Sequence, residues 1–324
     1  MSTLFSHFFQ KINQISPLEH NFTEVLESIA VKPKTLYFYG KLPENMSKNQ
    51  KIIPKLQNDN KNKSSTENRT SRPKTVAIVG SRHNTRYGEE IAHKMSYELA
   101  KRGAVIVSGL AYGIDSIAHR AALDAGGTTV AILGTPIDKI YPKNHLKLAE
   151  DIIKNGGAII SEYAPGEMVH HKVSFLERNR IISGLSDIVV VVEAAERSGS
   201  LNTATHAINQ GKDVFAVPGN ITNPYSKGCN KLISQGAFPY IELDDMLRIL
   251  FPEEFIKKKH SQLKLIGDND IETAILKSIS VGINDGDDIM NNINIPPEVF
   301  NQSIILLEIK NRIKSTGYNK WILL

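Results

Sequence analysis

The residues that follow the first long apolar run are suited to holding a phosphate. The run at 76–79 is followed at once by Gly80, Ser81 and Arg82. A glycine lets the backbone approach an anion closely, a serine hydroxyl donates a hydrogen bond, and a guanidinium supplies positive charge. The glycine spacing differs from a dinucleotide fingerprint, and the lysine of an ATP-binding phosphate loop is absent. We therefore predict a compact seat for one backbone phosphate at this turn.

Similar short motifs stand at the ends of other apolar runs. They are Ser108-Gly109, Gly134-Thr135 and Ser198-Gly199-Ser200. Several such seats in one row suit a polyanion, or a nucleotide with several points of contact. Each motif alone could simply form a tight turn or a helix N-cap, which is the commoner role of these residues. Their combination favours anion binding.

Arginines flank these motifs, at positions 82, 86, 178, 180 and 197. Arg178, Asn179 and Arg180 are expected just inside a helix start, where positive side chains oppose the helix dipole unless an anion lies opposite. The alternative is ion pairing with Glu162, Glu177 or Glu193. Phe175 lies next to this cluster and is a candidate for stacking on a base, although core packing is the commoner role of phenylalanine.

A sheet of buried strands must position these motifs. Apolar runs rich in β-branched residues occur at 76–80, 104–109, 129–134, 158–162, 187–194, 213–219 and 237–242, with helix-length segments between them. Runs without polar alternation are typical of parallel strands covered by helices on both faces. The predicted fold is therefore α/β, an extended Rossmann-like, doubly wound, mainly parallel sheet. Such sheets bind ligands beyond the carboxyl ends of their strands.

Composition divides the chain into five segments. We predict a short helical lead-in (1–46, with a helix near 21–30 and a strand near 34–40), a basic, polar, flexible insertion (47–74), the sheet domain (75–250), a linker (251–265) and a small C-terminal domain (266–324). The insertion is rich in Lys, Asn and Ser without apolar periodicity, so it cannot bury enough apolar surface to become ordered.

The net charge of +5 is unevenly distributed along the sequence. The insertion holds eight basic and two acidic residues, whereas 75–250 holds eighteen of each and 266–324 holds five basic and eight acidic. The net positive charge of the whole chain therefore does not indicate that the sheet domain binds an anion. If that domain binds an anion, it must do so through a local cluster.

Several classes of protein are excluded or disfavoured. The single cysteine, Cys229, permits no intrachain disulfide and no cysteine-based metal cluster. No apolar run is long enough to span a bilayer, and the first residues suit an amphipathic helix better than a signal peptide, so we expect a cytoplasmic protein. Asp115 and His119, four residues apart, are interpreted as a stabilising and packing pair. We predict no catalytic residue, metal or cofactor.

Several distinctive stretches together carry a resemblance to a known family. "GSRHNTRYG", "SGLAYGIDSIAHRAAL" and "FLERNRIISGLSDIVVVVEAAERSGSLNTATHAINQGKDVFAVPG" resemble the DNA-processing protein A (DprA/Smf) family, and the likeness extends over about 74–250. Residues 20–46 are similar to that family's lead-in. Most of the usual N-terminal helical domain is missing, and the insertion at 47–74 is a departure.

The resemblance implies a single-stranded DNA-binding recombination mediator. Members of the family bind single strands in a basic pocket, form dimers and load RecA recombinase during natural transformation. It therefore implies a homodimer without catalytic chemistry, with single-stranded DNA and RecA as partners. Transferred to this sequence, the pocket would comprise Gly80, Ser81, Arg82, Ser108, Gly109, Phe175, Arg178, Asn179 and Arg180, with Lys172 at its rim.

The main rival is a phosphoribohydrolase-like enzyme of the related fold, which cleaves nucleoside monophosphates. Those enzymes carry a Pro-Gly-Gly-x-Gly-Thr-x-x-Glu run where this chain reads "ERSGSLNTATHA". The double glycine and the glutamate are both absent, which favours binding without turnover. A dehydrogenase is less favoured still, because the second strand ends in Ser108-Gly109 and lacks an acidic residue for a ribose.

The C-terminal segment is expected to form helices at 270–279, 285–291 and 297–309 followed by a hairpin, an order similar to the winged-helix module of many family members. The third helix of such modules often reads duplex DNA. Here it offers Glu298 and Glu308 before Lys310. We therefore expect a protein contact at this domain and no duplex binding.

Overall fold

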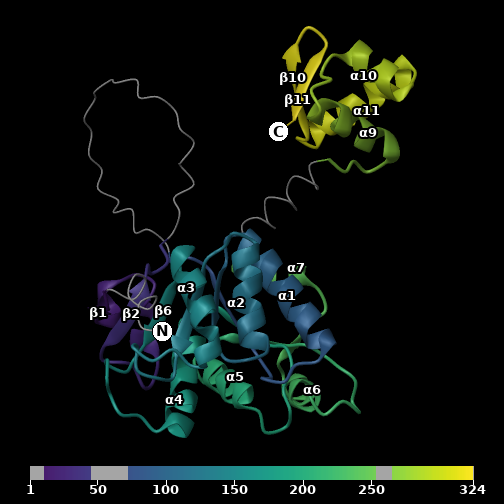
Figure 1. Cartoon of the computed structure of the whole chain (residues 1–324). Helices are drawn as coiled ribbons and strands as arrows, with labels where there is room; N and C mark the ends of the chain where they lie inside the picture. The colour runs from purple at the N-terminus through teal and green to yellow at the C-terminus, as the bar shows by residue number, and fades with distance from the viewer. Residues whose placement is uncertain (1–10, 45–71, 253–264, 324) are drawn as a thin grey trace, which may run out of the picture. The chain divides into compact units, whose positions relative to one another are not determined.

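A computed structural model describes residues 11–44, 72–252 and 265–323 (Figure 1). The chain divides into two compact units, Met1–Met246 and Leu247–Leu324. The insertion expected at 47–74 and the amphipathic helix expected at the N-terminus lie largely outside the described residues, as does most of the expected linker. None of the helices in the described ranges is long and apolar enough to cross a membrane.

The first unit contains a nine-stranded sheet in the order β1-β2-β6-β5-β4-β3-β7-β8-β9. Its strands from β3 onward are β3 (Thr75–Val79), β4 (Val105–Ser108), β5 (Thr129–Leu133), β6 (Ala158–Ser161), β7 (Ile188–Val191), β8 (Asp213–Ala216) and β9 (Phe238–Pro239). All of these pair in parallel, and β3 to β7 are buried throughout. The unbroken apolar runs are explained by this burial, because both faces of the sheet are covered.

Helices cover both faces of this sheet (Figure 1). Figure 1 shows α1 (Arg86–Lys101), α2 (Ile114–Asp124) and α3 (Leu146–Lys154) in one layer, and α4 (His171–Gly184), α5 (Gly199–Asn209) and α6 (Lys227–Ser234) in the other. Side chains of α4, α5 and α6 pack with the strands in the largest buried apolar cluster. Helix α7 (Leu243–Leu250) follows the last strand.

The lead-in differs from the expectation. Instead of a helix near 21–30, the structure has two short 3-10 turns, Pro17–Glu19 and Glu24–Ser28. Strands β1 (Asn13–Ile15) and β2 (Leu36–Gly40) extend the sheet as antiparallel members, with β2 pairing to β6. Phe22 and Leu26 are fully buried in the apolar cluster of the sheet, so tertiary packing, and not helix propensity, shapes this segment.

Residues 265–323, the part of the second unit described after the gap, contain three helices and a hairpin. They are α9 (Asp270–Ser280), α10 (Gly286–Ile293), α11 (Pro297–Ile309), β10 (Ile313–Gly317) and β11 (Lys320–Leu323). Phe300, Leu307 and Trp321 contribute to a separate apolar core. The order of elements matches the sequence-based expectation, and the winged-helix assignment remains a prediction.

Candidate functional site

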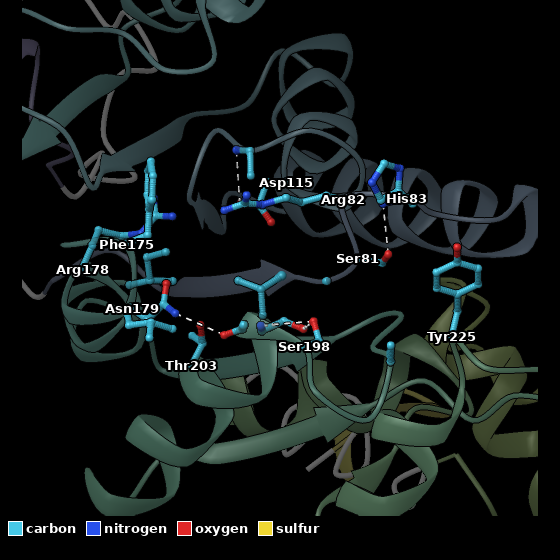
Figure 2. A pocket seen from close by; sticks show the side chains of 18 residues that line it. Ser81, Arg82, His83, Asp115, Phe175, Arg178, Asn179, Ser198, Thr203 and Tyr225 are labelled. Atoms are coloured by element: carbon cyan, nitrogen blue, oxygen red, sulfur yellow. Dashed lines mark hydrogen bonds between the residues drawn. The ribbon is translucent and has the colours of Figure 1, made fainter. Parts of the chain in front are cut away.

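A pocket of about 460 Å³ lies where the strand order reverses. From the central strand β3 the chain builds β4, β5 and β6 on one side, and then crosses to β7, β8 and β9 on the other. The crevice beyond the carboxyl ends of β3 and β7 is the usual ligand site of such sheets. Figure 2 shows its lining side chains, which come from the end of β3 and the turn after it, from the loops after β4 and β7, from α2, α4 and α5, and from the loop before α6. Of the thirteen sequence-predicted site residues, nine line it: Gly80, Ser81, Arg82, Phe175, Arg178, Asn179, Ser198, Gly199 and Ser200.

The turn after β3 is shaped by close packing against α2. A Cβ on Gly80 would lie 2.7 Å from the Ile114 side chain, so this glycine is required by the fold. Gly113 has φ +74, and its missing Cβ leaves room for the carbonyl oxygen of Ser81, which accepts a hydrogen bond from the Ile114 amide at 3.1 Å. The Ser81 hydroxyl accepts from the amide of His83 at 3.1 Å. These contacts fix the direction in which the next side chain, Arg82, leaves the turn.

Arg82 is the exposed cation of the pocket. Its guanidinium carbon lies 5.6 Å from the centroid of the Phe175 ring, a cation–π contact. No carboxylate in the described part of the chain forms an ion pair with it. An arginine held by a ring and not by an acid keeps its charge available to an anionic ligand.

Arg178 is a buried cation beneath the pocket. One of its terminal nitrogens donates to the carbonyl oxygens of Gly109 and Ile132. A Cβ on Gly109 would lie 2.6 Å from the guanidinium, so this glycine makes room for the arginine. Burial lowers the pKa of Arg178 to about 10, while the nearby Asp115 opposes that shift. The side chain therefore stays protonated at neutral pH, and its Nε is buried without a hydrogen-bond partner.

Asp115 is a lining residue whose part in the pocket was not predicted. Its Oδ2 accepts from the amides of Gly109 at 3.1 Å and Ala111 at 3.4 Å. Burial raises the pKa of this carboxyl group, and the charge of Arg178 opposes the rise. The carboxylate thus ties the loop after β4 to α2, in line with the stabilising role expected for it. His83, Thr203 and Tyr225 also line the pocket, and none of them was predicted as a site residue. His83 and Thr203 lie within the stretches that carry the family resemblance.

The predicted start of the arginine-bearing helix was wrong. Helix α4 begins at His171, which places Arg178, Asn179 and Arg180 in its middle. The argument from the helix dipole therefore does not apply to them. Arg180 does not line the pocket. Its Nη2 lies 2.7 Å from both carboxylate oxygens of Glu162, which is one of the ion pairs considered from the sequence.

Other predicted residues are divided between site and scaffold. The Ser108 side chain is buried, does not line the pocket, and donates to the carbonyl oxygen of Ile78 at 2.6 Å. Gly109 borders an adjoining smaller hollow. Asn179 does line the pocket and donates to the carbonyl oxygen of Gly199 at 3.2 Å. Lys172 lies in the first turn of α4, and its side chain is outside the described part of the structure.

The N-terminus of α5 opens into the pocket through Ser198, Gly199 and Ser200. Ser198 is the N-cap, and its hydroxyl oxygen accepts from the amide of Ser200 at 3.4 Å. A Cβ on Gly199 would meet nothing within 4 Å, in contrast to Gly80 and Gly109. Packing within the described residues therefore does not require a glycine at position 199.

Comparison with known proteins identifies the family. A family model described as DNA recombination-mediator protein A matches residues 64–251. The chain belongs to this family. The matched region includes strands β3 to β9 and the whole pocket. The resemblance noted from the sequence motifs is thereby confirmed.

Named relatives agree with this assignment. Protein Smf of Escherichia coli (strain K12) is 48% identical over 175 residues, covering 54% of this chain and 46% of that protein. DNA processing protein DprA of Bacillus subtilis (strain 168) is 42% identical over 187 residues, covering 58% of this chain and 62% of that protein. The matched region spans about half to three-fifths of these curated relatives.

Solved structures of the family share the fold. The X-ray structure of DNA processing protein A from Streptococcus pneumoniae has a TM-score of 0.59 and 37% identity, covering 75% of each chain. DNA processing protein A from Helicobacter pylori has a TM-score of 0.60 and 31% identity, covering 76% of this chain and 98% of that one. The Helicobacter structure was described for its single-stranded DNA binding mode. The predicted Rossmann-like fold class is confirmed.

Proposed function

We propose that this protein binds single-stranded DNA in the pocket beyond β3 and β7, as a recombination mediator that does not alter the strand chemically. The observation that carries the proposal is the combination of Arg82, the open N-terminus of α5 and the Phe175 ring in one pocket. Phosphates are recognised by guanidinium groups and helix N-termini, and unpaired bases stack on aromatic rings. A pocket with all three suits a nucleotide unit of a single strand.

Each lining group has a distinct part in this proposal. Arg82 contacts a backbone phosphate, and Phe175 offers its ring to the adjoining base. Arg178 supplies a fixed positive charge beneath the site, since its pKa of about 10, although lowered by burial, keeps it protonated at neutral pH. Arg180 and Ser108 stabilise the fold and do not contact the strand. Arg180 pairs with Glu162, and the Ser108 hydroxyl donates to the carbonyl oxygen of Ile78.

Gly199 supports a phosphate seat at the start of α5. The space that a side chain would fill there is open. A phosphate approaching the first amides of the helix would need that space, and the positive end of the helix dipole would favour it. A bound phosphate would therefore explain the glycine at position 199, whereas packing within the described residues does not.

The remaining elements of the proposal follow from family membership. We infer that the protein acts as a homodimer in the cytoplasm and loads RecA recombinase onto incoming single strands during natural transformation. The family description as a recombination mediator supports this role. RecA filament formation on strands coated with single-strand-binding protein, with and without this protein, would test it.

Binding of labelled oligo-dT and of a matched duplex over a salt series tests the DNA proposal. Single strands should bind more tightly, with an affinity that falls steeply as salt rises, because several cations neutralise phosphates. Gly199→Asp should keep its fold, since an acid is favourable at a helix N-terminus, but should lose most oligo-dT binding. Thr205→Asp adds the same charge at an exposed position of α5 outside the pocket and is the control. Equal binding of strand and duplex, or wild-type affinity in Gly199→Asp, would contradict the proposal.

The phosphoribohydrolase alternative has a direct test of its own. Asp115 is the only carboxylate among the lining residues described, and its Oδ2 is engaged by two backbone amides. That engagement favours binding over turnover. Incubation with AMP should therefore release no adenine, and release of adenine would favour the enzyme.

A further inference from the structure

A smaller hollow of about 20 Å³ adjoins the main pocket. Arg82, Ala111, Phe175 and Arg178 line both of them. The residues that line only the smaller hollow are Gly109, Tyr112, Tyr141 and Pro142. Because the two share a wall, they form one surface that passes over the Arg82–Phe175 contact. The smaller hollow cannot enclose a base, so a base could meet only the exposed ring faces around it.

Tyr112 presents a positioned ring at this place. It is 44% exposed, and its ring contacts the His145 ring edge-on with centroids 4.8 Å apart. His145 is itself buried, with Nδ1 2.8 Å from the carbonyl oxygen of Leu110. The tyrosine is therefore supported from below while much of it faces solvent, an arrangement suited to stacking.

Tyr141 continues the row of aromatic and cationic groups. It is 47% exposed, and its ring centroid lies 5.4 Å from that of Phe175. Lys139 and Lys143 flank it in the sequence, and both are exposed. Aromatic rings interleaved with cations along a groove are the common means of holding single strands, because each base offers a face and each linkage a charge.

We propose that Tyr112 and Tyr141 form a second base-stacking site for the nucleotides that follow the one in the pocket. The strand would run from the N-terminus of α5, across Arg82 and Phe175, to the two tyrosines. The inference rests on the proposed function, since it assigns the next part of the same ligand. Stacking requires an unpaired base, so this site adds to the preference for single strands and is tolerant of sequence.

An abasic scan on the full chain tests the second site. One abasic residue is moved along a short labelled oligo-dT, and affinity is measured for wild type and Tyr112→Leu. Loss of one stacked base should weaken binding of the intact strand by about fivefold or more in Tyr112→Leu. That loss should disappear when the abasic residue lies at the position that faces Tyr112, whereas a merely structural role would give the same loss at every position. Tyr112→Phe should bind like wild type.

Two further variants complete the design. Tyr87→Leu is the control, because Tyr87 is 45% exposed and lines neither hollow. Tyr141→Leu repeats the scan if Tyr112→Leu fails to fold, and its position-dependent loss should fall on a different nucleotide. Wild-type affinity in Tyr112→Leu, or a loss that is equal at all abasic positions, would overturn the second site while the pocket stands. Failure of the wild type to bind any oligo-dT would overturn the pocket as well.

Discussion

The pocket of the sheet unit and helix α11 of the C-terminal unit are the two places where DNA binding could be expected, and they hold their cations differently. In the pocket, Arg82 lies over an aromatic ring and Arg178 donates to backbone carbonyls. In the C-terminal unit, Lys310 lies 2.8 Å from Asp268 and 2.9 Å from Glu272. The hydrogen bonds that the Lys310 ammonium donates to these carboxylates raise the pKa of Lys310.

The outer side of α11 is apolar and not basic. Ile305, Leu306 and Ile309 are exposed along it, and Glu298 is the acidic residue of its first turn. A recognition helix for duplex DNA normally presents cations and amides to base edges and phosphates. We therefore keep the prediction of a protein partner, and not a duplex, for this surface.

This difference shows that, for DNA binding, it matters more whether a cation is already paired with a carboxylate than how many cations a unit contains. Residues 75–250 carry no net charge, yet they contain an arginine without a carboxylate partner among the described residues. Residues 266–324 carry −3, and their Lys310 is already paired. A count of charges would rank the two units only weakly, whereas their contacts distinguish Arg82 of the pocket from Lys310 at the end of α11.

The largest expected effect distinguishes the two arginines of the pocket. Arg178→Ala should lower the free energy of unfolding by about 3–5 kcal/mol near neutral pH, because Asp115 would remain buried without its cation. The loss should shrink at lower pH, where protonation of Asp115 removes the unpaired charge. Arg178→Met combined with Asp115→Asn should recover part of it. Urea unfolding measures these changes, and unchanged stability in Arg178→Ala would show that this arginine does not support the fold.

Acidification should weaken the sheet unit selectively. Burial lowers the pKa of His119 from 6.5 to about 3, and residues 265–324 contain no histidine. Below pH 6.5 His119 becomes protonated in the unfolded state but stays neutral in the folded state. The free energy of unfolding therefore falls as the pH falls toward 3. The expected loss between pH 7 and pH 5 is about 2 kcal/mol. His119→Asn should remove that share of the slope in urea unfolding, and an identical slope in both proteins would contradict the assignment.

Removal of the C-terminal unit should have the smallest effect. A chain that ends at residue 264 should bind oligo-dT within about twofold of the full chain, because the removed surface carries the same sign of charge as the phosphates. Fluorescence anisotropy with oligo-dT and duplex measures both affinities. A tenfold loss of affinity for either ligand would place a DNA contact on α11 or its hairpin. It would contradict the claim that only the sheet unit binds DNA.

Much of the fold and part of the site follow from the sequence. Unbroken β-branched runs predicted the parallel strands, and the motifs at their ends predicted that Gly80–Arg82 and Ser198–Ser200 would face one crevice. The reason is general, because carboxyl ends of parallel strands meet at one edge. Short local motifs and the parallel direction of the strands were sufficient for this part.

The roles of individual polar groups could not be predicted in the same way. Helix α4 begins at His171 with His170 as N-cap and no side-chain capping bond, so the usual start signal is missing. Ser174 lies inside the helix, and its hydroxyl donates to the carbonyl oxygen of Gly134 at 2.7 Å. Ser108 and Arg180 likewise find partners that are distant in sequence. Such long-range pairs decide whether a donor serves the ligand or the scaffold.

The salt dependence of oligo-dT binding by Arg82→Ala tests the central claim most directly. Lys101→Ala is the matched control, because Lys101 lies 5.8 Å over the Tyr97 ring and does not line the pocket. Arg82→Ala should stay folded, bind about 1.5–3 kcal/mol more weakly, and show a salt slope shallower by about 0.7. Lys101→Ala should leave both quantities unchanged. Wild-type affinity and slope in a folded Arg82→Ala would show that the strand is not bound at this turn.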